Sequence, residues 1–211
     1  MNVSRRFSVG GERPLILTDV LGLKIGALYE FIVTTCNDHE PHAAPMGIRI
    51  LSGDEFSMRS YGETLTLKNL MKNGTGCLNV IMDAITFYQS LFNPKSLTYE
   101  WIEGVPKLKK ALGWAIFKVE NLKHGGGYYE VTCRAIKGWA KKVKAIPPCR
   151  ASSSLIEALI HYTRIKYYEA RRDAEKSSSL RQLALHHLDI VERTGWSEIR
   201  RIAKKIRRAL R

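Results

Sequence analysis

The hydrophobic pattern of this chain changes its period once, and that change limits the folds the chain can adopt. Before about residue 148 the apolar residues mostly follow the spacing of strands, and after it they follow the spacing of helices. Pro147-Pro148 stands at the change, and a helix interior does not accept proline. We therefore expect a mainly β domain over residues 26–148, a helical subdomain over 149–211 and an N-terminal extension over 1–25.

The β domain shows short alternating segments separated by turn residues. Apolar Tyr29, Phe31 and Val33 alternate with their neighbours, as in a strand with one buried face. Similar segments predict strands at residues 29–34, 43–51, 55–60, 75–83, 97–102, 111–120 and 128–137. Turns are expected at Ser52-Gly53-Asp54 and at Gly125-Gly126-Gly127. About seven strands joined by short turns favour a closed barrel over an open sheet.

Two short helices are expected between these strands. Residues 64–73 carry apolar side chains at helical spacing, and Gly74 stands where a helix commonly ends. Asp83 is placed to cap a second helix over residues 84–91.

Three helices are expected in the last third of the chain. Ser154 followed by Glu157 is a capping-box pattern and predicts that the first helix opens there. Ser177 to Ser179 predict a break, and the second helix then buries Leu183 and ends at Gly195. The third helix starts near Ser197. Its expected buried stripe is Ile199, Ile202, Ala203, Ile206 and Leu210.

Composition describes a globular protein with a substantial core. Of 211 residues, 45% are hydrophobic and 26% are charged. No apolar run approaches the roughly 20 residues of a membrane span, and the N-terminus shows no secretory signal. We expect no membrane partner and a cytoplasmic location.

The net charge of +14 predicts an anionic partner. Residues 151–211 hold 14 basic and 7 acidic residues, a net +7. Such a tail is either a solvated helix face or a surface for phosphates of nucleic acid, of a cofactor or of an acidic partner.

Metal binding is not predicted. The four cysteines stand singly, without C-x-x-C pairs, and are interpreted as reduced thiols. None of the six histidines is paired by the sequence with an acid or a thiol, so none is predicted to be catalytic.

The segment from Arg59 to Asn69 offers what a phosphate group needs. A dianion is bound by fixed positive charge, by hydroxyl donors and by backbone N–H groups at a helix N-terminus. Arg59 supplies the charge, Thr64 and Thr66 supply hydroxyls, and Gly62 permits close backbone approach. The competing interpretation makes Thr64 only a helix cap and Arg59 only a surface charge.

This segment is the third of four short sequence blocks that follow one another along the chain. They are Tyr29-Glu30-Phe31-Ile32-Val33-Thr34-Thr35, Ala43-Ala44-Pro45-Met46-Gly47, Arg59 with Thr64-x-Thr66-x-x-Asn69-Leu70, and Asn79-Val80 with Asp83. Together they resemble the prokaryotic FMN-binding split-barrel family that is catalogued as a domain of unknown function and is distantly related to flavin reductases and pyridoxamine phosphate oxidases. The resemblance implies a split β-barrel followed by a helical subdomain.

The resemblance also implies a cofactor, an assembly and residue roles. FMN would lie between the subunits of a homodimer. Arg59, Ser60, Thr64, Thr66 and Asn69 would hold the phosphate, with Arg150 as another candidate. Ala44, Pro45, Met46 and Gly47 would line the isoalloxazine edge. Asn79 and Asp83 would either bind the ribityl hydroxyls or hold the strand end.

The predicted function is therefore that of an FMN-binding oxidoreductase. Electrons would pass from NADH, NADPH or another donor to an unidentified acceptor, and the flavin would supply that chemistry. No catalytic side chain is identified. The alternatives are a nucleic-acid or partner-binding protein that uses the basic helices, and a flavin-storage dimer without turnover.

Overall fold

The computed structural model describes residues 5–7, 17–23, 25–26, 28–141 and 150–210. The chain divides into two compact units, Met1–Met82 with Gln89–Lys144, and Asp83–Tyr88 with Ala145–Arg211. The expected boundary at residue 148 lies outside the described residues. Part of the expected N-terminal extension belongs to the first unit, because Leu17 of α1 (Leu17–Leu21) is fully buried in its core.

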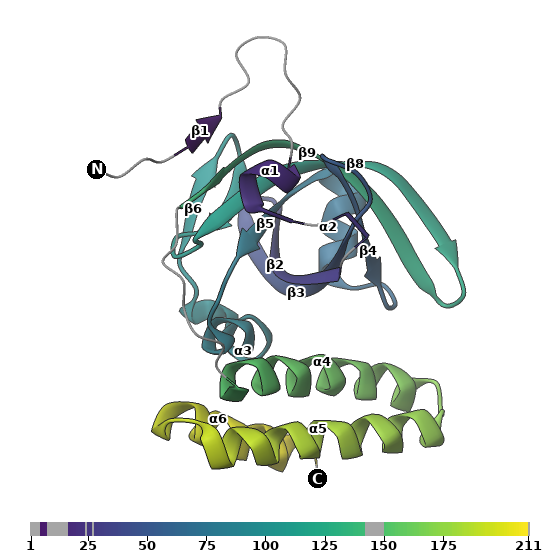
Figure 1. Ribbon diagram of the computed structural model, residues 1–211. Helices are drawn as coiled ribbons and strands as arrows, with labels where there is room; N and C mark the ends of the chain where they lie inside the picture. The colour runs from purple at the N-terminus through teal and green to yellow at the C-terminus, as the bar shows by residue number, and fades with distance from the viewer. Residues whose placement is uncertain (1–4, 8–16, 24, 27, 142–149, 211) are drawn as a thin grey trace. The chain divides into compact units, whose positions relative to one another are not determined.

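The first unit is an antiparallel β-barrel, which confirms the predicted architecture (Figure 1). Its strands run in the order β9-β4-β3-β2-β5-β8, and β8 pairs with β9 to close it. The strands are β2 (Leu28–Asn37), β3 (Glu40–Ile50), β4 (Glu55–Ser60), β5 (Thr75–Val80), β8 (Gly113–Gly125) and β9 (Tyr128–Ala140). A short strand, β1 (Arg5–Phe7), adds to β9. The barrel is filled by apolar side chains, including Phe56 and Phe117, whose rings meet edge to face at 5.2 Å.

A two-stranded hairpin outside the barrel was predicted only in part. Residues of β6 (Tyr99–Ile102) were expected as a strand, whereas β7 (Val105–Leu108) was not. The two strands are joined by Glu103 and Gly104, both at positive φ. That backbone is the one a tight two-residue hairpin needs.

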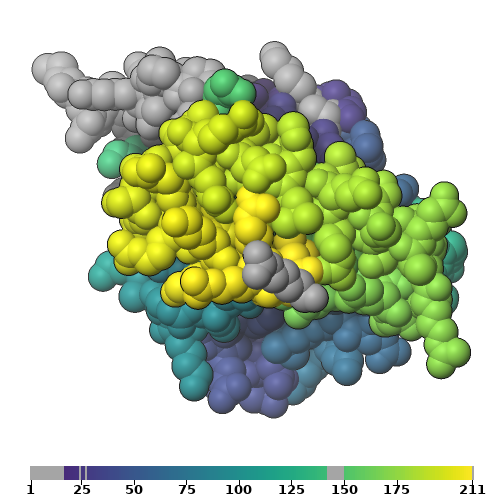
Figure 2. All heavy atoms as spheres, turned by 90° about the horizontal axis from the view of Figure 1, so that it is seen from below, coloured from purple at the N-terminus to yellow at the C-terminus, as the bar shows by residue number. Residues whose placement is uncertain are grey.

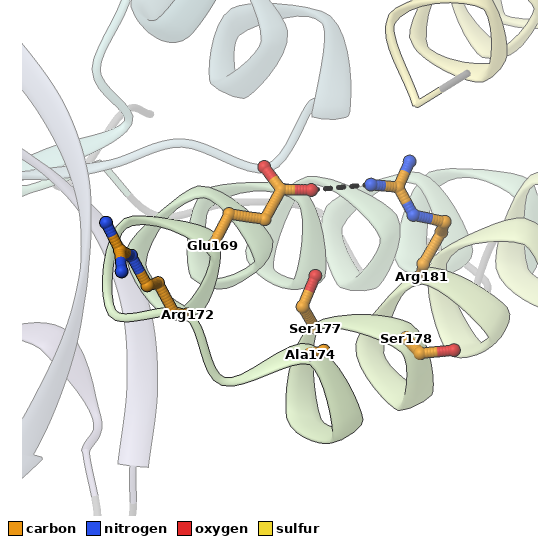
Figure 3. A pocket seen from close by; sticks show the side chains of 6 residues that line it. All are labelled: Glu169, Arg172, Ala174, Ser177, Ser178 and Arg181. Carbon is orange, nitrogen blue, oxygen red and sulfur yellow. Dashed lines mark hydrogen bonds and ion pairs between the residues drawn. The ribbon is translucent and has the colours of Figure 1, made fainter.

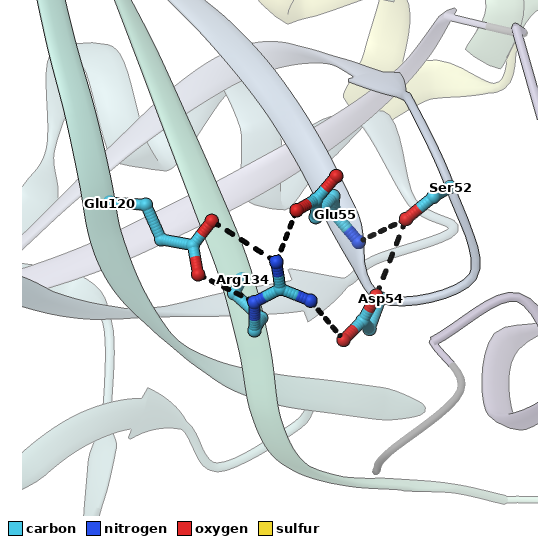
Figure 4. A network of polar contacts seen from close by, with 5 residues as sticks. All are labelled: Ser52, Asp54, Glu55, Glu120 and Arg134. Carbon is cyan, nitrogen blue, oxygen red and sulfur yellow. Dashed lines mark hydrogen bonds and ion pairs between the residues drawn. The ribbon is translucent and has the colours of Figure 1, made fainter.

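Charged residues fasten one end of β4 to its neighbours (Figure 4). The guanidinium of Arg134 on β9 donates to Asp54 at 2.7 Å, to Glu120 at 2.5 Å and to Glu55. Ser52 donates to Asp54 and accepts from the backbone N–H of Glu55. Hydrogen bonds to Glu120 and Asp54 raise the pKa of Arg134. The register of β4 is thereby fixed at the end where that strand begins.

Two helices follow β4 and β5, as predicted. α2 (Leu65–Asn73) ends at Gly74, whose φ of 65° requires glycine and whose N–H donates to Leu70. α3 (Ala84–Phe92) is capped by Asp83, which accepts from the backbone N–H and the hydroxyl of Thr86. A 3₁₀ turn, η1 (Pro94–Ser96), follows.

The second unit contains α4 (Arg150–Ala170), α5 (Ala174–Thr194) and α6 (Ser197–Ala209). The surface formed by α5 and α6, yellow-green to yellow, faces the viewer in Figure 2. Arg207 on α6 donates to Asp189 at 2.5 Å and to Glu192 at 2.9 Å on α5, and this ties the two helices together. The predicted buried stripe of α6 is confirmed in full.

Three expectations about these helices were wrong. α4 already runs from Arg150, so Ser154 is a buried residue inside the helix and does not open it. Ser177 to Ser179 lie inside α5, because serine disfavours a helix only weakly. The break lies at Arg172, with φ of 58°, and Asp173 caps α5 by accepting from Lys176 N–H. Leu183, expected to be inward, is 44% exposed.

None of the described helices has the length and apolar content to cross a membrane.

Candidate functional site

The N-terminus of α2 is an exposed donor site at the end of β4. Gly62, at φ of 83°, makes the turn between strand and helix that other residues adopt only with strain. Thr64 is the N-cap, and its hydroxyl accepts from the N–H of Leu67. The N–H groups of Leu65 and Thr66 have no acceptor within the helix, since the first turn of a helix has none. Thr64 and Leu65 are exposed, so the positive end of the helix faces solvent.

Ser60 and Arg59 reach this end of β4 from opposite faces of the strand. The Ser60 side chain points inward, is buried, and its Oγ lies 2.9 Å from Thr64 Oγ1. Arg59 is half-exposed, lies over the Tyr128 ring at 4.5 Å and has its Nε 3.9 Å from Glu130 Oε1. Among the described residues, no hydrogen bond or ion pair joins Arg59 to Thr64. The structure thus groups Ser60 with Thr64 and places Arg59 on the other face of β4, against Tyr128 and Glu130.

Thr66 and Asn69 face the sheet and hold α2 against it. Both side chains are 2% exposed. Thr66 Oγ1 lies 3.0 Å from His42 Nε2 on β3, and Asn69 Nδ2 donates to Thr35 Oγ1 on β2 at 2.9 Å. These contacts set the angle at which the helix N-terminus is presented.

His42 belongs to this site, although the strand predicted from the sequence begins only at residue 43. The β2–β3 turn consists only of Asp38 and His39, both at positive φ without any glycine, so β3 already begins at Glu40. Lys72 on α2 donates to Asp38 at 2.7 Å and so helps to hold that turn. An Asp-His pair is an unusual turn sequence, and the usual Asn-Gly or Asp-Gly signal was missing.

One edge of β3 is open. In the described sheet, β3 pairs with β4 only at Ile48–Ile50, while residues 40–47 have a ladder with β2 alone. Ala44, Pro45, Met46 and Gly47 lie on this open stretch, and all four are partly exposed.

The two prolines show which way the backbone groups of β3 point. Proline has no N–H to give to a ladder, so Pro41 and Pro45 must direct their backbone away from β2. In an antiparallel strand alternate residues point the same way, so Ala43 and Gly47 also face the open edge. That edge therefore carries the N–H groups of Ala43 and Gly47 and several carbonyl acceptors, and of the two donors only that of Gly47 belongs to a partly exposed residue. A Cβ on Gly47 would meet its nearest neighbour at an ordinary 3.4 Å, so packing within the chain does not require glycine there.

Of the two roles left open for Asn79 and Asp83, the contacts support the structural one. Asn79 is fully buried, donates to Ile32 O and Thr34 Oγ1, and accepts from Leu108 N–H at 2.7 Å. Asp83 caps α3 through Thr86. Arg150 is the exposed first residue of α4, in the second unit.

The His42 contact predicts a pH effect on stability. Burial lowers the pKa of His42 from its ordinary value. In the unfolded chain a histidine has a pKa of about 6.5. Below about that pH the unfolded chain therefore binds more protons than the folded protein does, and the free energy of unfolding decreases as the pH falls. We expect the urea midpoint to fall between about pH 7.5 and pH 5.5 by more in the wild type than in His42→Gln. If the urea midpoint fell equally in the wild type and in His42→Gln, His42 would not be a source of the pH dependence of stability.

Two of the three thiols in the described part of the chain, those of Cys77 and Cys133, are buried. Cys36, Cys77 and Cys133 are free, and burial raises the pKa of Cys77 to about 12. A buried thiol with a raised pKa is a poor nucleophile. Cys149 lies outside the described residues.

A surface hollow in the second unit is a separate candidate (Figure 3). It lies where α4 meets α5 and is lined by Glu169, Arg172, Ala174, Ser177, Ser178 and Arg181. Arg181 donates to Glu169 at 2.6 Å, so this cation is already paired. No residue predicted to bind the cofactor lines this hollow.

Comparison with protein families identifies both parts of the chain. A model described as protein of unknown function (DUF447), N-terminal domain, matches residues 29–141, and a second DUF447 model matches residues 149–208.

Comparison with solved structures confirms the split-barrel fold. The crystal structure of an FMN-bound DUF447 protein from Methanosarcina mazei is 25% identical, covers 92% of this chain and 100% of its own, and has a TM-score of 0.72. A candidate flavin reductase with a split barrel domain from Shewanella frigidimarina is 14% identical and covers 57% of this chain and 70% of its own, with a TM-score of 0.50. The second likeness concerns the fold alone.

Proposed function

Because this chain belongs to the DUF447 protein family, we propose that it is a flavoprotein that binds FMN and uses it as an oxidoreductase. The observation that carries this proposal is the likeness, over 92% of this chain, to a family member whose crystal structure holds FMN. Two features of the barrel fit that cofactor, the exposed N-terminus of α2 and the open edge of β3.

The FMN phosphate is assigned to the N-terminus of α2. Ser60 and Thr64 offer hydroxyls 2.9 Å apart, and the first-turn N–H groups point out of the helix end. Arg59 reaches the same site by leaving the ring of Tyr128, and its single positive charge then offsets part of the charge of the dianion. Thr66 and Asn69, whose side chains hold α2 on the sheet, contribute through the placement of the helix and the N–H of Thr66.

The isoalloxazine edge is assigned to Ala44–Gly47 on β3. That ring edge alternates hydrogen-bond acceptors with one N–H donor, and the open strand edge offers the Gly47 N–H and neighbouring carbonyls to match it. Met46 and Ala44 are partly exposed and provide apolar contact. When bound, the flavin supplies hydride and electron transfer, and the protein supplies position and electrostatics.

The assembly we propose is a homodimer with FMN between its subunits. On α2, Leu65 in the first turn is 49% exposed, and Met71 toward the other end of the helix is 62% exposed. Leu28, at the start of β2, is 54% exposed. Exposed large apolar side chains such as these favour a surface that a partner covers.

The purified protein tests this proposal directly. We expect the absorption bands of oxidised flavin, release of one FMN per subunit on denaturation, a dimeric mass in solution, and loss of the flavin bands when NADH or NADPH is added without oxygen. FMN added to the stripped protein should raise its melting temperature. The proposal would be wrong if the purified protein were colourless and saturating FMN did not stabilise it. If FMN were bound but neither NADH nor NADPH reduced it, the protein would be a flavin-storage protein or would use another electron donor.

Nucleic acid is the second candidate partner, favoured by the surface of α6. Arg200, Arg201, Lys204, Lys205 and Arg208 are all exposed there. The exposed positions of α6 after Ser197 hold no aromatic residue, which suits phosphate contact more than base reading. A salt-dependent gel shift with mixed oligonucleotides that persists in the FMN-free protein would favour this function.

A further inference from the structure

The helical unit holds a group of polar side chains that the flavin site does not use. Glu157 and His161 lie on α4, and His187 lies on α5. Residues four apart lie on one face of a helix, so Glu157 and His161 are neighbours one turn apart. The rings of His161 and His187 face each other across the helix pair, with centroids 5.6 Å apart and planes at 30°. The expectation that no histidine meets an acid was therefore wrong: Glu157 and His161 lie one turn apart on α4, and only His187 joins them from a second helix.

The geometry of this cluster is close to that of a metal site. One ligand atom of each of Glu157, His161 and His187 lies within 4.8 Å of the other two. A tetrahedral Zn²⁺ with bonds of roughly 2.0–2.1 Å keeps its ligand atoms roughly 3.4 Å apart. Rotation of the exposed Glu157 side chain and small ring movements would close the difference. In the part of the chain that the structure describes, this is the one such cluster of His, Cys, Asp or Glu.

A second observation concerns the histidines alone. Nδ1 of His161 and Nδ1 of His187 are both buried without a hydrogen-bond partner, and no other side-chain nitrogen or oxygen in the described residues is in this state. A buried polar atom without a partner costs stability, so native proteins rarely leave one. The two unpartnered Nδ1 atoms lie in facing rings near the carboxylate of Glu157, and this indicates a bound ion or molecule that contacts both rings.

We propose that Glu157, His161 and His187 bind a Zn²⁺ ion that links α4 to α5. Two imidazoles and one carboxylate form the three-ligand set with which zinc leaves a fourth position for water or another ligand. Mg²⁺ and Ca²⁺ prefer oxygen ligands and should not compete. The ion would join the two longest helices of this unit near the middle of each.

Titration of the full chain, freed of metal by a chelator, tests this site. Titration calorimetry should show that one equivalent of Zn²⁺ binds. A thermal scan should show that bound Zn²⁺ raises the melting temperature of the protein. His161→Gln and His187→Gln should each weaken binding at least about tenfold. His186→Gln is the matched control, since His186 precedes His187 on α5 but is exposed and outside the cluster. Glu157→Gln, at an exposed position, gives a third variant if a histidine variant does not fold.

Two further measurements separate this site from binding elsewhere. Co²⁺ should give the visible bands of nitrogen and oxygen ligands without a thiolate charge-transfer band, which excludes the cysteines. The charge of Arg164 acts on His161, so Arg164→Gln should tighten Zn²⁺ binding by a few-fold. No Zn²⁺ uptake, or equal uptake by the wild type and by the variants of all three ligands, would overturn the proposal. Neither result depends on FMN, so the flavin proposal stands or fails separately.

Discussion

The double variant Arg59→Ala/Thr64→Ala is expected to lose most of its affinity for FMN. It removes the cation and one of the hydroxyls that we assign to the proposed phosphate site at the N-terminus of α2. Losing two charge-assisted contacts costs about 2–5 kcal/mol, which corresponds to a rise in Kd of roughly 30- to 5,000-fold. Quenching of FMN fluorescence on titration into the stripped protein measures it.

Two controls separate phosphate binding from helix capping and from general charge. Thr64→Ser keeps the hydroxyl that accepts from Leu67 N–H, and should bind FMN within a few-fold of the wild type. Arg49→Ala removes an exposed arginine of β3 that donates to Gly26 O and should leave the affinity unchanged. An unchanged affinity in the double variant would place the phosphate elsewhere, with Arg150 the next residue to replace.

Asn79→Leu is expected to lower the free energy of unfolding by about 2–5 kcal/mol, because each buried group left without a partner costs about 1–3 kcal/mol. The variant leaves Leu108 N–H, Ile32 O and Thr34 Oγ1 without the Asn79 amide, in a fully buried position. Since small domains are stable by only about 5–15 kcal/mol, the effect is large. Urea denaturation followed by tryptophan fluorescence measures it.

Asn121→Ala supplies the comparison for Asn79. Asn121 is exposed on β8, and its replacement should change stability by no more than about 0.5 kcal/mol. If Asn79→Leu were as mild as Asn121→Ala, the buried amide would not be holding β2, β5 and β7 together.

The family and the barrel could be predicted because their signals are local and ordered. β4 was predicted with its observed bounds, since Ser52-Gly53-Asp54 marks its start and Gly62 follows its end. The C-terminus of α2 was likewise marked by Gly74. The short strand β7 was missed because Pro106 and Lys107 interrupt its apolar pattern, and it is a strand through its antiparallel pairing with β6.

The site could be predicted only where sequence neighbours are also neighbours in space. Ser60, Thr64 and the α2 N-terminus were expected together and lie together. His42 could not be assigned to Thr66, 24 residues away, because the turn that starts β3 lacks glycine. The same limit hid the pairing of His161 with His187, which depends on how two helices pack.

The open edge of β3 also bears on solubility. A bare strand edge is a template on which another chain can pair, and natural proteins interrupt such edges with proline. Pro41 and Pro45 remove alternate donors from this edge, so an extended segment of a second molecule would find a broken ladder. The prolines leave in place the N–H of Gly47, a partly exposed residue. The stretch to which we assign the isoalloxazine edge is thereby a poor template for pairing with a strand of a second molecule.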